Sequence, residues 1–347
     1  MEQILQQPFL SRQVSVFGDG VFMKLIVVIA FIVTATIADL AQAQQSAKMP
    51  RVAYLSNARF SEIPYRVAGF RQGLRELGYM EGKNIVVEWR EGTNDQVPAL
   101  VSEVIGLKVD VIVAAAGSLT RAVKAATSTV PVVMAQDSDP VGNGFVTSLS
   151  HPGGNITGLS TLAPELNGKK LEILKEVIPR ISRVAVFVSS NVGDFSHVSK
   201  KEVELAAAAL RLKIHYLDVL TPADFENAFK EAIKGRAHGA LMEVGGPVAI
   251  PNRKKTAELA VKSRLPVMYR RIQDVEAGGL MTYGVNIADL DRRAATYVDK
   301  ILKGTKPANL PIEQPKKFEL IINLKAAKQI GLMIPPTVLA RADRVIK

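Results

Sequence analysis

The chain has 347 residues, of which 48% are hydrophobic and 22% charged, so it is long enough for two domains and apolar enough to bury a core in each. It has no cysteine, which excludes disulfides, thiolate catalysis, cysteine-ligated zinc and a lipidated N-terminal cysteine. The formal charge is +11, but basic and acidic residues are interspersed and aromatic residues make up only 6%. The surplus therefore predicts a solvated basic surface and no nucleic-acid partner.

The N-terminal region has the pattern of an export signal. Met23-Lys24 precedes an apolar run over 25–33, and Ala41-Gln42-Ala43 follows as a small-x-small cleavage site. The run is too short for a membrane span. We therefore expect a signal peptide over 23–43, cleaved after Ala43, and a periplasmic location; an uncleaved anchor is the alternative. Residues 1–22 are interpreted as a gene-start artefact or a long leader.

From residue 51 onwards, apolar strands alternate with amphipathic helices. In a first series, expected to form lobe 1 over 51–160, the patterns predict strands over 51–56, 84–90, 109–116 and 130–135, and helices over 61–77, over 97–105 and from Ser118. Glycines and prolines between 142 and 154 predict a long loop, and 155–161 leads out of it. Ser61 and Ser118 are the expected helix N-caps. The run over 109–116 is continuously apolar, which is typical of a strand buried on both faces.

A second series is expected to form lobe 2 over 161–285. It predicts helices over 165–178, 198–210, 223–234 and 253–263, and strands over 183–191, 213–219, 238–244, 265–269 and 279–284. In the segment 286–347 we expect a helix over 288–302, a strand over 317–322, a helix over 324–330 and a last helix after Pro335-Pro336. This segment should return, at least in part, to lobe 1. The fold class is therefore α/β, with two doubly wound parallel-sheet lobes joined by a multi-crossover hinge beside a cleft.

The loops that follow the predicted strands carry the candidate binding residues. The turn at Gly117-Ser118 presents backbone N–H groups at the carboxyl edge of a sheet, so it is a candidate seat for an anionic group such as a ligand carboxylate; a plain strand-to-helix connection is the alternative. With neutral donors, carboxylates and two tyrosine rings, the set suits a small zwitterion. The candidates are Ser56, Asn57, Gly117, Ser118, Leu119, Asp137, Ser138, Asp139, Ser190, Asn191, Glu243, Tyr269 and Tyr283.

Several of these residues also have simpler structural interpretations. Asp137, Ser138 and Asp139 are equally suited to capping a turn, the last of them before Pro140. Glu243 is equally suited to pairing with a nearby lysine. Tyr269 and Tyr283 are equally suited to the core, with a solvated hydroxyl.

Catalytic signatures are absent from the sequence. It contains no phosphate loop, no dinucleotide-binding glycine motif and no nucleophile elbow. The four histidines lie in separate predicted elements without metal-ligand spacing. We therefore predict no catalytic residues, no cofactor and no metal site, and consider an enzyme the least favoured class.

Six short motifs are distributed along 50–347, namely FRQGLRELGYMEGKN at 70–84, DPV at 139–141, PGGNITG at 152–158, AGGLMTYG at 277–284, ILKG at 301–304 and KFELIIN at 317–323. Through these motifs the chain resembles the exported substrate-binding proteins of ABC transporters, in the branch that includes tryptophan- and tyrosine-type binding proteins. One departure is Asn191-Val192-Gly193, where the family often has Asn-Pro.

This resemblance implies a two-lobed type I periplasmic-binding fold that closes on its ligand. It also implies delivery of a small molecule, with a leaning to an amino acid and to an aromatic one, to a membrane permease driven by a separate ATPase. We expect a monomer. The alternative function is a periplasmic sensory module that presents the same ligand to a receptor.

Overall fold

The computed structural model describes residues 49–190 and 197–347. The leader and signal peptide predicted over 1–43 lie outside the described residues. In the described part of the chain, no helix is both long and apolar enough to cross a bilayer. The account below concerns Pro50–Lys347, which forms one compact unit.

The first sheet has five parallel strands among the described residues. They are β1 (Arg51–Ser56), β2 (Val86–Glu91), β3 (Val111–Ala114), β4 (Val132–Asp137) and β5 (Ile156–Ser160). Their order is β2-β1-β3-β4-β5. The central strands are mostly apolar because both faces of the sheet are covered, and all residues of β3 and β4 are buried, including Gln136 and Asp137 at the end of β4.

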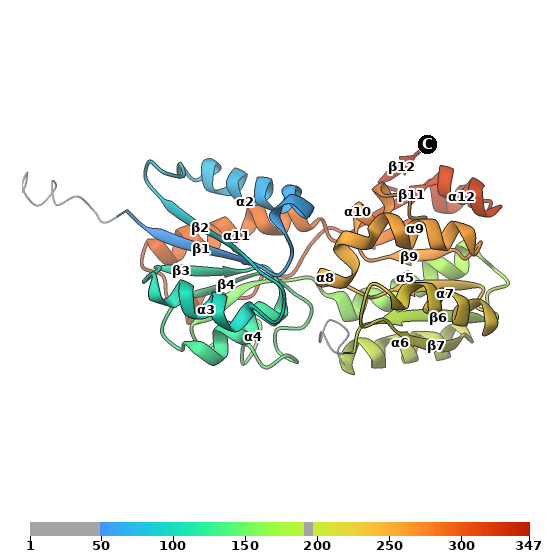
Figure 1. Ribbon diagram of the computed structural model, residues 1–347, viewed down its shortest axis with the longest axis horizontal. Helices are drawn as coiled ribbons and strands as arrows, with labels where there is room; N and C mark the ends of the chain where they lie inside the picture. Colours follow the sequence, from blue (N-terminus) through green and yellow to red (C-terminus); the bar gives the residue numbers. More distant parts are fainter. Residues whose placement is uncertain (1–48, 191–196) are drawn as a thin grey trace, which may run out of the picture. The chain divides into compact units, whose positions relative to one another are not determined.

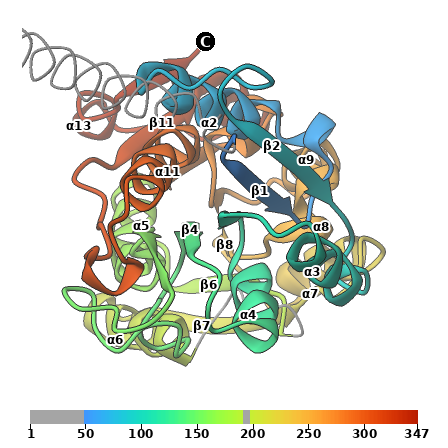
Figure 2. The same cartoon turned by 90° about the vertical axis from the view of Figure 1, so that its left-hand side faces the viewer.

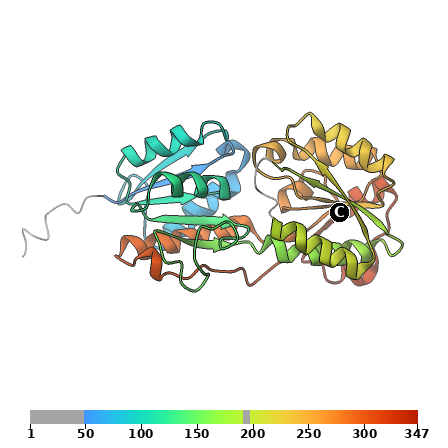
Figure 3. The same ribbon diagram turned by 90° about the horizontal axis from the view of Figure 1, so that it is seen from below.

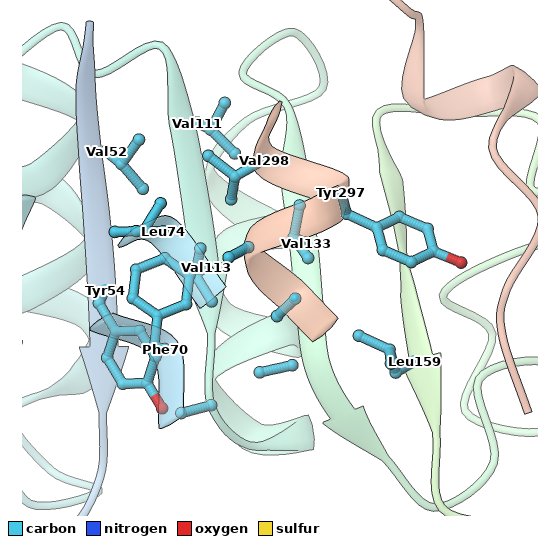
Figure 4. Close-up of a cluster of buried hydrophobic side chains, with 14 of the residues drawn as sticks. Val52, Tyr54, Phe70, Leu74, Val111, Val113, Val133, Leu159, Tyr297 and Val298 are labelled. Atoms are coloured by element: carbon cyan, nitrogen blue, oxygen red, sulfur yellow. The ribbon is translucent and has the colours of Figure 1, made fainter. Parts of the chain in front are cut away.

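Alternate residues of these strands enter two separate cores. Helices α3 (Val97–Gly106) and α4 (Gly117–Ala126) pack on one face, and α2 (Pro64–Glu76) and α11 (Ile287–Leu302) pack on the other (Figure 2). Figure 4 shows the second of these cores, in which the rings of Tyr54 and Phe70 lie together beside β1 while Tyr297 and Val298 of α11 lie over the sheet. The helix α11 thus covers one face of a sheet whose strands all lie more than a hundred residues earlier in the sequence.

The second sheet has seven strands among the described residues, in the order β12-β11-β10-β9-β8-β6-β7. The strands are β6 (Arg183–Val188), β7 (Lys213–Asp218), β8 (Gly239–Met242), β9 (Val267–Tyr269), β10 (Met281–Gly284), β11 (Glu319–Asn323) and β12 (Arg344–Ile346). Neighbouring strands are parallel except β10 and β11. The α/β architecture with helix-covered parallel sheets, predicted from the alternation, is confirmed apart from this one antiparallel pair.

Helices cover both faces of this sheet as well (Figures 1 and 3). On one face lie α5 (Ala163–Val177) and α6 (His197–Leu210), and on the other α7 (Asp224–Lys234) and α9 (Arg253–Lys262). The shorter helices are α8 (Gly246–Ala249), α10 (Ile272–Glu276), α12 (Leu324–Ile330) and α13 (Pro336–Leu339), with 3₁₀ turns η1 (Phe60–Glu62), η2 (Ile250–Asn252) and η3 (Pro307–Asn309). Pattern analysis missed α8, α10 and β12, which are too short to show a period.

The C-terminal segment is divided between the two sheets. Its first part, α11 and η3, packs on the first sheet, whereas β11 pairs with β10 and β12 with β11 in the second. The partial return of 286–347 to lobe 1 thus concerns α11 and η3, whereas 319–346 joins the second sheet. The reason is that β10 would otherwise be an apolar edge strand, and β11 supplies its missing hydrogen-bond partner.

The described chain passes between the sheets at three places. These lie between β5 and α5, between β10 and α11, and between η3 and β11. The first and third are hydrogen-bonded to each other, since Ser160 N–H donates to the Glu313 carbonyl (2.9 Å) and Glu313 N–H donates to the Gly158 carbonyl (2.9 Å). Two of the three passages thus form a small piece of parallel sheet.

Both predicted serine N-caps are wrong. Helix α2 begins at Pro64, three residues after Ser61, because proline fixes a helical φ and lacks the N–H that a first turn leaves unpaired. Helix α4 begins at Gly117, and its N-cap is Ala116 in an extended conformation, with no side-chain cap. Ser118 therefore lies inside the first turn, and its hydroxyl is available for other contacts.

A buried ionic cluster fastens α11 to the first sheet. Asp291 accepts hydrogen bonds from Tyr54 Oη (2.7 Å), Arg66 Nε (2.7 Å) and Arg66 Nη2 (3.0 Å). Arg66 Nη1 also donates to the Ala115 carbonyl at the end of β3 (2.9 Å). Burial, with Asp291 close by, raises the pKa of Tyr54 well above its ordinary value. The cluster joins β1, α2, β3 and α11 at one point.

The helices α2 and α11 approach each other closely because α2 carries two glycines one turn apart. A Cβ atom on Gly69 would lie 2.3 Å from the Ala288 carbonyl oxygen, and one on Gly73 would lie 2.0 Å from that of Arg292. Both distances are far below van der Waals contact. Helix packing therefore explains Gly73 in the FRQGLRE motif and Gly69 directly before it.

Candidate functional site

A cavity of about 610 Å³ is lined by residues that follow strands of both sheets. The first sheet contributes Gly117 and Ser118 after β3, Gln136, Asp137 and Ser138 at the end of β4, and Thr161 after β5. The second sheet contributes Ser190 after β6 and Arg270 and Arg271 after β9. All these positions are at carboxyl ends of strands, where open α/β sheets bind ligands.

One wall of the cavity is apolar and belongs to two helices. Val97 and Pro98 come from the first turn of α3, and Ala122 and Ala125 come from α4. Small-molecule sites commonly combine such an apolar surface with a few polar groups that fix orientation.

The turn into α4 is closely packed against a carboxylate of the protein itself. A Cβ atom on Gly117 would lie 2.7 Å from Asp137 Oδ2. The other oxygen, Oδ1, accepts from Asp139 N–H (2.9 Å) and from Asn143 Nδ2 (3.0 Å). Asp137 therefore places a negative charge at the N-terminus of α4, where the helix dipole favours one. A ligand anion at this turn would lie beside that charge.

Neutral hydrogen-bonding groups cluster next to the same turn. Asn57 Nδ2 donates to Ser118 Oγ (3.2 Å) and to Asn94 Oδ1 (3.3 Å). Gln136 Nε2 donates to the Ala115 carbonyl (3.0 Å), which fixes its amide at the cavity wall. These contacts orient side chains of Asn94, Ser118 and Gln136 before any ligand arrives.

On the side of the second sheet, a buried ion pair supports Arg270. Lys170 Nζ lies 2.7 Å from Glu243 Oε1, and both side chains are only 4% exposed. Arg270 Nε lies 3.7 Å from Glu243 Oε2, and its Nη1 donates to the Glu243 carbonyl (3.1 Å). The carboxylate is thus shared by two cations, and Arg270 is held against the end of β8.

Arg271 lies beside Arg270 and is in a different situation. Within the described part of the chain, its Nη1 atom is buried and has no hydrogen-bond partner. Burial lowers the pKa of Arg271, and the nearby cations Arg270, Arg66 and Arg253 lower it further. A guanidinium in this position adds positive charge to the cavity wall.

Five of the candidates from the sequence lie on the cavity wall, namely Gly117, Ser118, Asp137, Ser138 and Ser190. Asn57 touches the wall through Asn94 and Ser118. Asn191 lies outside the described residues.

The other candidates are placed elsewhere by their contacts. Leu119 and Tyr269 are wholly buried in the cores, and Tyr269 Oη donates to the Thr256 carbonyl (3.3 Å). Ser56 Oγ donates to the Ala58 carbonyl, and Asp139 caps the turn at Gly142 N–H (2.8 Å). Glu243 is paired with Lys170. Tyr283 lies near Phe318, with ring centroids 6.0 Å apart, and lines a smaller cavity that shares Gln136, Thr161, Arg270 and Arg271 with the first.

Sequence reasoning missed most of the wall contributed by α3 and by the loop after β9. The polar lining residues that were not among the candidates are Asn94, Arg121, Gln136, Asn143, Thr161, Arg270 and Arg271, although the loop at Tyr269-Arg270 was expected at the cleft. The position of Arg270 and Arg271, directly after a short apolar strand, was the available signal for them. In the residues that the structure describes, no group of histidine, aspartate or glutamate is arranged to hold a metal ion.

Comparison with known proteins gives a consistent picture. A family model described as ABC transporter substrate binding protein matches residues 62–346. A curated tyrosine-binding protein of Clostridioides difficile is 23% identical over 266 residues, which are 76% of this chain and 76% of that protein.

Two solved structures are among those with a similar fold. A conserved domain protein from Vibrio cholerae has 28% identity and a TM-score of 0.79 and aligns with 86% of this chain and all of its own. An ABC domain from Streptococcus pneumoniae, in complex with L-Trp, has 23% identity and a TM-score of 0.79, covering 86% of this chain and 99% of its own. The fold is therefore that of type I periplasmic binding proteins.

Proposed function

The chain belongs to the family of ABC transporter substrate-binding proteins, and we propose that it is the solute receptor of an ABC importer. The proposed solute is an amino acid, and an aromatic amino acid is the favoured class. The relatives that bind tyrosine and L-Trp support this choice of solute. The receptor is proposed to be exported through the N-terminal signal, to act as a monomer in the periplasm, and to deliver its solute to a membrane permease.

The observation that carries the proposal is the cavity lined from both sheets. Its volume of about 610 Å³ lies within the range of small-molecule sites, about 300–1,000 Å³. A solute that contacts Ser118 and Gln136 on one side and Arg270 and Arg271 on the other gains contacts only when both sides are near it. Such a solute shifts the protein towards the closed arrangement, and a permease recognises that arrangement.

The test is thermal unfolding and calorimetric titration of the mature protein with the twenty amino acids, short peptides, sugars and organic acids. We expect one solute per chain to bind and to raise the melting temperature. At a solute concentration 100 times the Kd, the gain of about 2.7 kcal/mol corresponds to roughly 5–10 °C.

A pair of variants on the same helix links this effect to the cavity. Ala122→Phe fills the apolar wall and should abolish the melting shift, whereas Ala126→Phe, on the exposed side of α4, should preserve it. The proposal is wrong if no member of the panel shifts the melting temperature, or if both variants respond as the wild type does.

A further inference from the structure

We propose that Arg271 binds the carboxylate of the solute, so that an acid group is the feature for which the site selects. This inference rests on the proposed function, because it assigns the role of one residue in the same cavity. It differs from the expectation that the solute anion sits on the backbone turn at Gly117 and Ser118.

The charged groups of the cavity wall have distinct partners. Arg270 is held by Glu243, and the guanidinium of Arg121 lies 5.3 Å from the centroid of the Phe145 ring. Asp137 accepts hydrogen bonds from the loop after β4. Arg271 differs, because the described residues offer its buried Nη1 no hydrogen-bond partner.

The acids around Arg271 are already engaged by other cations. Asp274 accepts from Arg253 Nε (3.2 Å) and from the main-chain N–H of Arg271 (3.2 Å). Arg66, another neighbouring cation, is paired with Asp291. Among the described residues, the Asp274 carboxylate is therefore the acid that acts on both Arg253 and Arg271, so these two cations share one negative charge there.

A buried cation without its own counterion is unfavourable, and an incoming anion relieves that cost. A carboxylate suits the position because its two oxygens match the parallel N–H groups of a guanidinium. The turn at Gly117 is less suitable, because the Asp137 carboxylate already lies there. With its acid group at Arg271, the rest of the solute can lie on the apolar wall of Val97, Pro98 and Ala122.

The experiment compares acids with their amides. Dissociation constants of L-tryptophan, L-tyrosine and the corresponding amides are measured for the wild type, Arg271→Gln, Arg271→Lys and the control Arg75→Gln, an exposed arginine of α2 outside the cavity. We expect the wild type to bind the acids about 100-fold more tightly than the amides. Arg271→Gln should reduce that ratio to near one, Arg271→Lys should retain part of it, and Arg75→Gln should retain all of it.

A second measurement does not depend on the solute. The ligand-free Arg271→Gln protein should melt no lower than the wild type, because the substitution removes a cation to which the described residues give no counterion of its own. A clearly lower melting temperature would overturn the inference by showing that the folded protein itself neutralises Arg271. An acid-to-amide ratio unchanged by Arg271→Gln would overturn it as well.

The screen of the wild type separates this inference from the proposed function. If a solute without an acid group is the one that binds, the assignment of Arg271 is wrong and the receptor function stands. If no solute in the panel binds, both are wrong. If acids bind and depend on Arg271, both are supported.

Discussion

Replacing Asp291 by asparagine should destabilise the protein more than any substitution of a surface charge. Asp291 is wholly buried and accepts three hydrogen bonds, two of them from the guanidinium of Arg66, which is itself 3% exposed. The Asp291→Asn protein keeps the shape of the side chain and leaves the Arg66 cation buried without an acid. Removing one partner of a buried ion pair costs about 3–5 kcal/mol, since the remaining charge keeps its full desolvation penalty.

The assay is urea unfolding followed by circular dichroism, with the midpoint falling and the slope unchanged. For about 300 folded residues, the loss corresponds to a melting temperature roughly 5–8 °C lower. As a control, Glu276→Gln removes the partner of Arg344 from a pair whose side chains are each nearly half exposed, and it should cost no more than about 1 kcal/mol. The double variant Arg66→Met with Asp291→Leu should recover much of the loss. A decrease below about 1 kcal/mol for Asp291→Asn would refute the reasoning.

Three further predictions concern close packing and tyrosine burial. Gly73→Ala should cost more than about 2 kcal/mol in urea unfolding, because the new Cβ would lie 2.0 Å from the Arg292 carbonyl oxygen; a change below about 0.5 kcal/mol would contradict the described contact. Gly117→Ala should raise the Kd of the solute about tenfold in calorimetry, because the new Cβ would lie 2.7 Å from Asp137 Oδ2 and would push that carboxylate away. An unchanged Kd would show that this turn does not take part in binding. Burial raises the pKa of Tyr269 above that of a tyrosine in the unfolded chain. The contribution of the neutral Tyr269 ring to stability is therefore complete below about pH 10. As the pH rises further, the free energy of unfolding falls by up to about 1.4 kcal/mol per pH unit. Between pH 9 and 12, the urea midpoint of Tyr269→Phe should therefore fall less steeply with pH than that of the wild type. The same dependence on pH in both proteins would contradict the burial of Tyr269.

The alternation of strands and helices was predictable because each buried element leaves a periodic pattern. The strand over 51–56 and the helix over 324–330 have the predicted bounds. The helix starts at Pro64 and Gly117 were not predictable in this way, and the predicted starts at Ser61 and Ser118 are wrong. Pro64 at a first turn and a backbone-only cap at Ala116 compete with the serine signal, and tertiary packing decides between them.

The cavity wall was only partly predictable. Positions after strands identify the edge of a sheet, so Gly117, Ser118 and Asp137 could be found from the sequence. The direction of a side chain at such a position depends on which face of the sheet it leaves from, and Tyr269 leaves towards α9, where its hydroxyl reaches Thr256. Arg271 could not be distinguished from a surface arginine, because what sets it apart is the set of neighbours around it and not its own residue type.

The division of the C-terminal segment between the two sheets affects how the protein is made. The first sheet lacks its covering helix until α11 has been synthesised, and the second lacks two strands until β12 has followed. At about 5–20 residues per second, the ribosome needs about 3–12 s for these last sixty or so residues. The core under α11 and the core that β11 shares with α5 and α6 cannot close during that interval, so one core of each sheet stays open until the end of synthesis.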